Sequence, residues 1–138
     1  MNYFILKYTN DMPDKFGGET RGPLISIRPK YSADVGLIEH EKTHVRQWYV
    51  VLALGLLLCT LLTLLVSPSL WPMYGLAPFL HQLLYKLVRV YRRWCEVRAY
   101  RKQIATGGYA SNEFAVSALV DKYGLRLSRE EARALLID

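Results

Sequence analysis

Hydrophobic and polar positions separate sharply along the chain, and their pattern predicts a helical protein with a little sheet. Residues 2–8 (NYFILKY) are rich in aromatic and β-branched side chains, which favours a short strand. Residues 24–31 (LISIRPKY) alternate, with Ile25 and Ile27 on one side, and predict a second strand that Pro29 ends. The stretch between them is rich in proline, glycine and charge, which indicates a loop.

A long helix is expected next, from about Val35 to Val66, with Ser32 or Asp34 as its N-terminal cap. Its first third is polar, whereas its last two thirds consist mainly of leucine, valine and alanine. Pro68 and Pro72 then stop it, since proline lacks the amide hydrogen that an α-helix needs.

A second helical region is expected from about Met73 to Ala105, with a kink or restart at Pro78. It is apolar first and basic later, and the glycines of TGGY end it. Residues 111–137 predict a pair of short helices, the second opening with a Ser128–Glu131 capping box. We therefore expect one domain over 1–138, mainly α with a small N-terminal β-hairpin or sheet, built around a long antiparallel apolar helical hairpin.

The apolar part of that hairpin is long enough for a membrane. Residues 47–85 contain no Asp, Glu, Lys or Arg, an uncharged run of 39 residues. Trp48 to Val66 would span roughly 28 Å as an α-helix at about 1.5 Å per residue, close to the ~30 Å of a bilayer core. The sequence thus predicts an embedded membrane hairpin at about 48–88. The alternative is a soluble hairpin buried in a core.

Charge and aromatic residues suggest how such a hairpin is oriented. The net charge is +6, and much of the excess lies between Lys86 and Lys102, at the same end of the hairpin as Arg46. By the positive-inside rule this end, both termini and the active site face the cytoplasm. The basic helical face is expected to touch anionic headgroups of the inner leaflet, and a nucleic-acid partner is the less favoured interpretation; this face comprises Arg92, Arg93, Arg98, Arg101 and Lys102. The two cysteines are expected to be free thiols, and no cleavable signal peptide is recognised.

The sequence HEKTH, residues 40–44, is the main candidate for chemistry. His40 and His44 are four residues apart, so on a helix both imidazoles project from one face and can bind a single Zn²⁺. Glu41 then sits beside the metal, where it can take a proton from a water that the zinc acidifies. Two solvated or buried helix histidines are the alternative interpretation.

A third ligand is needed for a catalytic zinc, and spacing favours Glu96. Counted from the turn near residue 69, His44 is 25 residues away and Glu96 is 27, a height difference of only about 3 Å in an antiparallel hairpin. His81 falls too near the membrane midpoint in this count. The site is therefore expected to hold one zinc per chain; the other residues considered are Cys95, Glu113, Glu130 and Glu131.

EHEKTH followed by CEVRAYRKQ on a later helix resembles the gluzincin branch of zincin metallopeptidases, in particular short phage and bacterial membrane-associated peptidase-like proteins. The resemblance implies a minimal zincin-like fold in which His40, His44 and Glu96 are zinc ligands and Glu41 is the general base. It also implies that strand 24–28 is an edge strand holding an extended substrate. Where many gluzincins place an aspartate four residues after the ligand glutamate, this chain has Tyr100. No residue for stabilising the oxyanion is identified; the candidates are Tyr31, Tyr100 and Tyr109.

Together these patterns predict a membrane-anchored zinc metalloendopeptidase that acts on a peptide or protein. Two other classes stay open. One is a non-enzymatic membrane hairpin, such as a phage-type effector or assembly protein, and the other is a soluble, zinc-stabilised binding domain.

Overall fold

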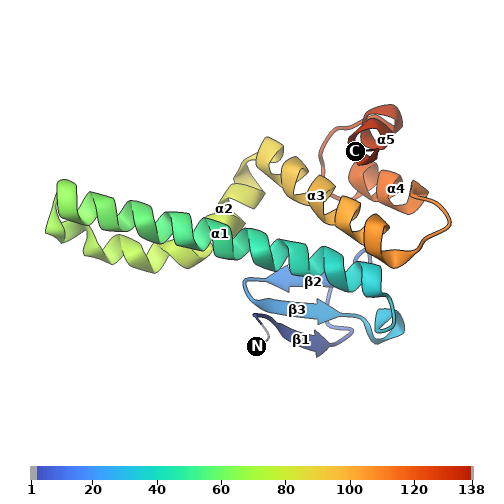
Figure 1. Cartoon of the computed structure of the whole chain (residues 1–138), viewed down its shortest axis with the longest axis horizontal. Coiled ribbons are helices and arrows are strands. Elements are labelled where there is room, and N and C mark those ends of the chain that lie inside the picture. Colours follow the sequence, from blue (N-terminus) through green and yellow to red (C-terminus); the bar gives the residue numbers. More distant parts are fainter. Residues whose placement is uncertain (1–2, 138) are drawn as a thin grey trace.

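A computed structural model of the chain describes residues 3–137 and is mainly helical, with one small sheet near the N-terminus (Figure 1). The strands are β1 (Ile5–Tyr8), β2 (Gly18–Arg21) and β3 (Leu24–Ile27), and β3 lies between the other two. β1 pairs with β3 in parallel, and β2 pairs with it antiparallel through a turn in which Gly22 has a φ of 60°. The prediction of a mainly α protein with a small N-terminal sheet is confirmed.

β2 lies in the stretch that the sequence predicts as a loop. Its residues, GETR, carry little intrinsic strand preference, so pairing with β3 and contact with the following helix decide its conformation. The predicted alternation in β3 is confirmed: Ile25 and Ile27 are both 0% exposed and pack against Val45. One face of the sheet is thereby fixed to the first long helix.

That helix, α1 (Val35–Leu65), runs for 31 residues without interruption, so the predicted bounds are confirmed. Of the two predicted caps, Asp34 is the one used, since its carboxylate accepts a hydrogen bond from the Leu37 amide at 2.9 Å.

The return arm differs from the single helical region that was predicted for it. It consists of η2 (Pro68–Phe79), α2 (Leu80–Leu87) and α3 (Arg89–Gly107). η2 is a 3₁₀-helix of 12 residues, much longer than the three or four residues usual for this structure. Three prolines within it lack the amide hydrogens of an α-helical ladder. The expected restart after Pro78 is confirmed, but Val88 is extended (φ −106°, ψ 99°) and breaks the arm a second time.

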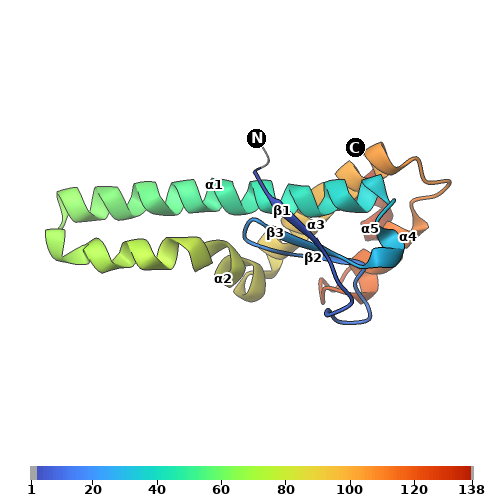
Figure 2. The same ribbon diagram turned by 90° about the horizontal axis from the view of Figure 1, so that it is seen from below.

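The apolar hairpin, by which we mean Trp48–Leu65 of α1 together with η2, projects away from the rest of the molecule in both views (Figures 1 and 2). The Tyr74 hydroxyl donates to Thr60 Oγ1 at 2.8 Å, and the Trp48 indole N–H donates to the Pro78 carbonyl at 2.8 Å. These two bonds tie η2 to α1. Much of the outer surface is exposed and apolar, including Leu57, Leu58, Leu61, Leu64, Leu65, Trp71, Leu76 and Phe79.

The C-terminal helices α4 (Glu113–Asp121) and α5 (Arg129–Leu136) cover the far side of α3. They close a second core with α3, whose buried members include Val97, Tyr100, Val116, Leu119, Leu125 and Leu136. The predicted capping box is confirmed by hydrogen bonds in both directions between Ser128 and Glu131. Gly108 ends α3 in the left-handed conformation, φ 63°, as the TGGY sequence predicts. Both chain ends lie away from the hairpin tip (Figure 1).

Candidate metal centre

His40 and His44 lie one turn apart on the side of α1 that faces α3. Their Nε2 atoms are 3.2 Å apart, as expected for i and i+4 positions of a helix. Burial lowers the pKa of His40 well below its usual value, and the neighbouring His44 acts in the same direction. The ring of His40 is therefore neutral, which is the form that ligates a metal.

Glu96 of α3 completes the cluster. Its Oε2 lies 3.6 Å from His40 Nε2, and its Oε1 lies 3.5 Å from His44 Nε2. Tetrahedral zinc with bonds of about 2.0–2.1 Å holds its ligand atoms about 3.3 Å from one another. Each Glu96 oxygen thus lies near that separation from one histidine nitrogen. Taken with one donor atom each, the three residues have all their donor atoms within 4.8 Å of one another, and they form a largely buried group that can bind a metal ion.

The electrostatics of Glu96 also favour a cation at this position. The residue is 1% exposed, and its Oε2 has no hydrogen-bond partner among the described residues. Burial raises the pKa of this carboxyl group, while His44 and a hydrogen bond from Tyr85 oppose the rise. A buried carboxylate oxygen without a partner is costly, and a metal ion between the three side chains would remove that cost.

Two glutamines orient the histidines from behind. Gln47 Oε1 lies 2.9 Å from His44 Nδ1, and the Gln47 amide nitrogen donates to the Cys95 carbonyl at 3.2 Å, linking α1 to α3. On the other ring, His40 Nδ1 and Gln103 Oε1 are both buried without a close partner. Gln103 is near enough that its side chain raises the pKa of His40, against the larger effect of burial. An Nδ1–H of His44 directed at the Gln47 amide oxygen leaves Nε2 of this ring free for a metal.

Glu41 lies beside this cluster, and β2 holds it there. Its Oε2 accepts a hydrogen bond from Thr20 Oγ1 at 2.7 Å. A methyl group added at Gly18 would approach Glu41 Oε1 to 2.7 Å, so β2 needs a glycine at this point. Burial raises the pKa of Glu41 to about 7, with His44 and the Thr20 hydrogen bond opposing the rise. The sequence motif alone does not reveal this contact, because β2 is not predicted.

A cavity of about 670 Å³ opens onto the cluster between β2 and α2. It is lined by His40, Glu41, His44 and Glu96, and from other elements by Thr20, Arg21, Trp48, Phe79, His81 and Tyr85. His81 is not part of the metal-ligand group, in line with the prediction that it is not the third ligand, but it lies closer to the site than the residue count implies. At roughly 2.0 Å per residue the 12 residues of η2 cover about 24 Å instead of about 18 Å, which moves His81 toward the site.

His81 and Tyr85 add polar groups that the sequence analysis does not identify. His81 Nδ1 lies 2.8 Å from the Tyr91 hydroxyl, which fixes the ring beside the cavity. The Tyr85 hydroxyl donates to Glu96 Oε1. One sequence signal points to them: on α2 they are four residues apart, so both project from the same face.

The tyrosines suggested from sequence have other contacts. Tyr100 packs edge-on against the His40 ring, with centroids 4.4 Å apart, and its hydroxyl pairs with Tyr123 at 2.9 Å. It supports the histidine by ring packing and not by a hydrogen bond to it. Tyr109 donates to Asp34, and neither Tyr31 nor Tyr109 lines the cavity.

The remaining ligand candidates lie elsewhere. Glu113 pairs with Arg129 and Arg133, and Glu131 caps α5. Cys95 and Cys59 are free and buried thiols, as predicted, and Cys95 is not part of the cluster. Glu130 is likewise outside it.

Comparison with known proteins finds no matching family model, no matching curated protein and no matching solved structure.

Proposed function

We propose that the chain is a zinc-dependent peptidase of the gluzincin type, anchored in a membrane by the apolar hairpin. One observation carries the proposal: a glutamate that follows the first histidine lies beside a three-ligand cluster that opens onto a cavity. Structural zinc sites are usually closed by four protein ligands, whereas catalytic sites use three and keep one position open. His40, His44 and Glu96 provide three ligands and the cavity provides the opening.

In this proposal each group of the chain has a separate task. Zinc held by His40, His44 and Glu96 supplies a Lewis acid that polarises a peptide carbonyl and lowers the pKa of water. Glu41, restrained by Thr20, accepts a proton and passes it to the departing amine. His81 and Tyr85 face the same cavity and are the candidates for hydrogen-bonding the carbonyl oxygen as charge develops on it.

The substrate strand must differ from the one that the resemblance implies. Strand 24–28 corresponds to β3, which has a partner on each side and cannot add another strand. β2 is the edge strand next to the cavity, and Gly18, Thr20 and Arg21 line it. We propose that an extended peptide pairs with the free edge of β2, which places its backbone across the metal ligands.

The membrane part of the proposal rests on the exposed hairpin. α1 is long and apolar enough to cross a bilayer, and only 11% of its most apolar 18-residue window is buried. A core helix of a soluble protein would bury most of such a window, so lipid is the environment that fits best. The basic residues lie at the base of the hairpin with both chain ends, which favours a cytoplasmic active site.

Metal analysis tests the catalytic proposal. Full-length protein purified in detergent is expected to contain close to one zinc per chain and to hydrolyse members of a quenched fluorescent peptide library. His44→Ala should lose both the zinc and the hydrolysis. Wild-type protein that is metal-free and cannot be loaded with zinc would refute the proposal.

The same exposed hairpin also favours a second candidate, a non-enzymatic membrane protein whose buried cluster only stabilises the fold. This candidate predicts that zinc binds but no peptide is cleaved, and that Glu41→Gln keeps full biological activity.

A further inference from the structure

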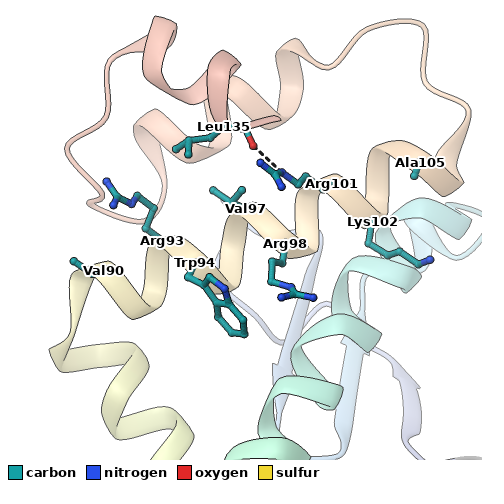
Figure 3. Close-up of a pocket in the computed structure, with 9 residues that line it drawn as sticks. All are labelled: Val90, Arg93, Trp94, Val97, Arg98, Arg101, Lys102, Ala105 and Leu135. Atoms are coloured by element: carbon teal, nitrogen blue, oxygen red, sulfur yellow. Dashed lines mark hydrogen bonds between the residues drawn. The ribbon is translucent and has the colours of Figure 1, made fainter. Parts of the chain in front are cut away.

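A second hollow lies along an exposed face of α3, bordered by α5 (Figure 3). It is separate from the metal centre, since it shares no lining residue with the cavity described above. Four cationic side chains and two exposed apolar ones dominate it: Arg93, Arg98, Arg101, Lys102, Val90 and Trp94.

The side chains that line this hollow are cationic or apolar. No acidic residue lines it. Glu131 interacts with Arg93 and Glu39 interacts with Lys102, but both carboxylates lie outside the lining. Several cations around one hollow form a site for a ligand with more than one anionic oxygen, such as a phosphate group.

Two of the arginines are already oriented by the protein. The Arg101 Nε donates to the Leu135 carbonyl at 2.8 Å, a bond drawn in Figure 3. The Arg98 guanidinium lies over the Trp94 ring, 5.0 Å from its centroid. Ordering these long side chains before binding reduces the entropy that a ligand must overcome.

An apolar path joins the hollow to the base of the membrane hairpin. Leu87 is 74% exposed, Val90 is 63% exposed, and Trp94 follows one turn later on α3. Apolar side chains that pass into tryptophan and then into arginine are typical of a helix crossing from acyl chains to headgroups. The acyl chain of a lipid would contact the apolar residues, and its phosphate would contact the arginines.

The aromatic contacts argue against nucleic acid as the ligand. Single-stranded nucleic acid is bound by stacking bases on free aromatic faces. The Trp94 ring is already engaged by Arg98 and by Tyr91, whose ring is stacked on it with centroids 5.9 Å apart.

We propose that the hollow between α3 and α5 binds the phosphate of an anionic phospholipid, with Arg93 and Arg98 as the main contacts. The acyl chain lies along Val90 and the exposed side of α2. The position of this site at the bilayer surface rests on the proposed membrane insertion, whereas recognition of the headgroup requires neither insertion nor catalysis.

Calorimetric titration of the full chain in non-ionic detergent tests the proposal. The titrants are a short-chain phosphatidylglycerol, phosphatidylcholine with the same chains, inorganic phosphate and a single-stranded RNA oligonucleotide. We expect saturable binding of phosphatidylglycerol, at least tenfold weaker in Arg93→Gln/Arg98→Gln. The matched control, Lys7→Gln/Lys30→Gln, removes two exposed charges from β1 and η1 (Pro29–Tyr31) and should bind like wild type. Circular dichroism spectra that match the wild type show that both variants are folded.

Four other outcomes overturn the assignment. Equal binding of phosphatidylcholine removes the anionic specificity, and equal loss in both double variants shows only a general charge effect. Inorganic phosphate bound as tightly as the lipid makes a free phosphate the ligand, and tighter binding of the RNA makes it a nucleic-acid site. A chain that fractionates without membranes yet binds phosphatidylglycerol would refute membrane insertion and leave the headgroup site standing.

Discussion

The two halves of α1 have opposite relations to solvent. In the inner half the polar residues His40, Glu41 and Gln47 are buried, at 3%, 4% and 7% exposure. In the outer half apolar residues are exposed, with Leu57 at 56% and Leu64 at 75%. A helix on the surface of a water-soluble domain shows the reverse arrangement. One uninterrupted helix therefore combines a polar interior with an apolar exterior.

The burial pattern of each half of α1 follows from what surrounds it. The inner half buries polar groups because other polar groups surround them: His40 faces Glu96 of α3, Gln47 donates to the Cys95 carbonyl, and Thr20 of β2 donates to Glu41. The outer half exposes leucines because, in the proposed function, acyl chains surround them. In the proposed function, the continuous α1 would hold the metal-ligand cluster at a constant height above the bilayer. Substitutions in the outer half are expected to have larger effects than those in the inner half.

Charge in the outer half should abolish membrane association. Leu57→Lys/Leu61→Lys places two cations on exposed positions of the hairpin. A lysine near the bilayer centre costs roughly 2.5–3.5 kcal/mol on insertion scales, so the pair costs about 5–7 kcal/mol. After an alkaline wash, most of the wild-type protein should stay in the membrane fraction, whereas little of the double variant should.

Val35→Lys is the matched control, because Val35 is equally exposed on α1 but lies at its inner end. It should leave membrane association unchanged. Wild-type protein that remains monodisperse in water without detergent would contradict the assignment of the outer half.

Removing the charge of Glu41 should separate metal binding from catalysis in the inner half. Glu41→Gln keeps the shape of a side chain that touches Thr20 but cannot accept the proton. General base catalysis contributes about 10²–10⁴ in rate, so peptide hydrolysis should fall by that factor while zinc stays near one per chain. Glu39→Gln, two residues away, weakens ion pairs with Lys42 and Arg46 that lie outside the metal-ligand cluster, and it should keep wild-type rates. Equal rates for both variants would favour the non-enzymatic candidate.

The glutamines behind the histidines should tune metal affinity by a smaller amount. Gln47→Ala removes the 2.9 Å contact to His44 and the link to Cys95. Losing such an outer partner typically weakens metal binding 10–100-fold, measurable by competition with a zinc-binding dye. Gln103→Ala should have the weaker effect, because His40 Nδ1 and Gln103 Oε1 have no close contact. The reverse order would show that the Gln103 amide turns toward His40 when metal binds.

Sequence reasoning succeeds in this molecule where the determining signal is local. The bounds of α1 follow from Asp34, Pro68 and the lack of an interior breaker, and the capping box locates α5. The juxtaposition of Glu96 with the histidines also follows from counting residues. The count assumes one straight α-helical return arm, which the structure does not have. The 3₁₀-helix η2 makes the arm longer, whereas the break at Val88 changes the direction of α3, and these two departures partly cancel at Glu96.

It fails where tertiary contacts decide the structure. The residues of β2 have no strand pattern of their own, so the contact between Thr20 and Glu41 is hidden from sequence. The long 3₁₀ segment is not expected from local rules. Counting with the α-helical rise instead places His81 too close to the tip of the hairpin. Gln103 lies two turns beyond Glu96 on α3, and nothing in its type distinguishes it from a surface glutamine.

The C-terminal helices differ from α1 because their charged residues lie on the surface. Their ion pairs should make a small, pH-dependent contribution to the thermal stability of the protein. Arg133, followed by Arg129, lowers the pKa of Glu113 to about 2. A carboxyl with a depressed pKa stabilises the fold above its ordinary pKa near 4.5 and loses this contribution as pH falls toward 2. The difference in thermal midpoint between wild type and Glu113→Gln should therefore be present at pH 6 and disappear by about pH 2. Glu130→Gln removes the same charge from α5 without these contacts to Arg129 and Arg133, so its midpoint should differ less from wild type at pH 6. A pH-independent difference for Glu113→Gln would mean that shape, and not charge, joins α4 to α5.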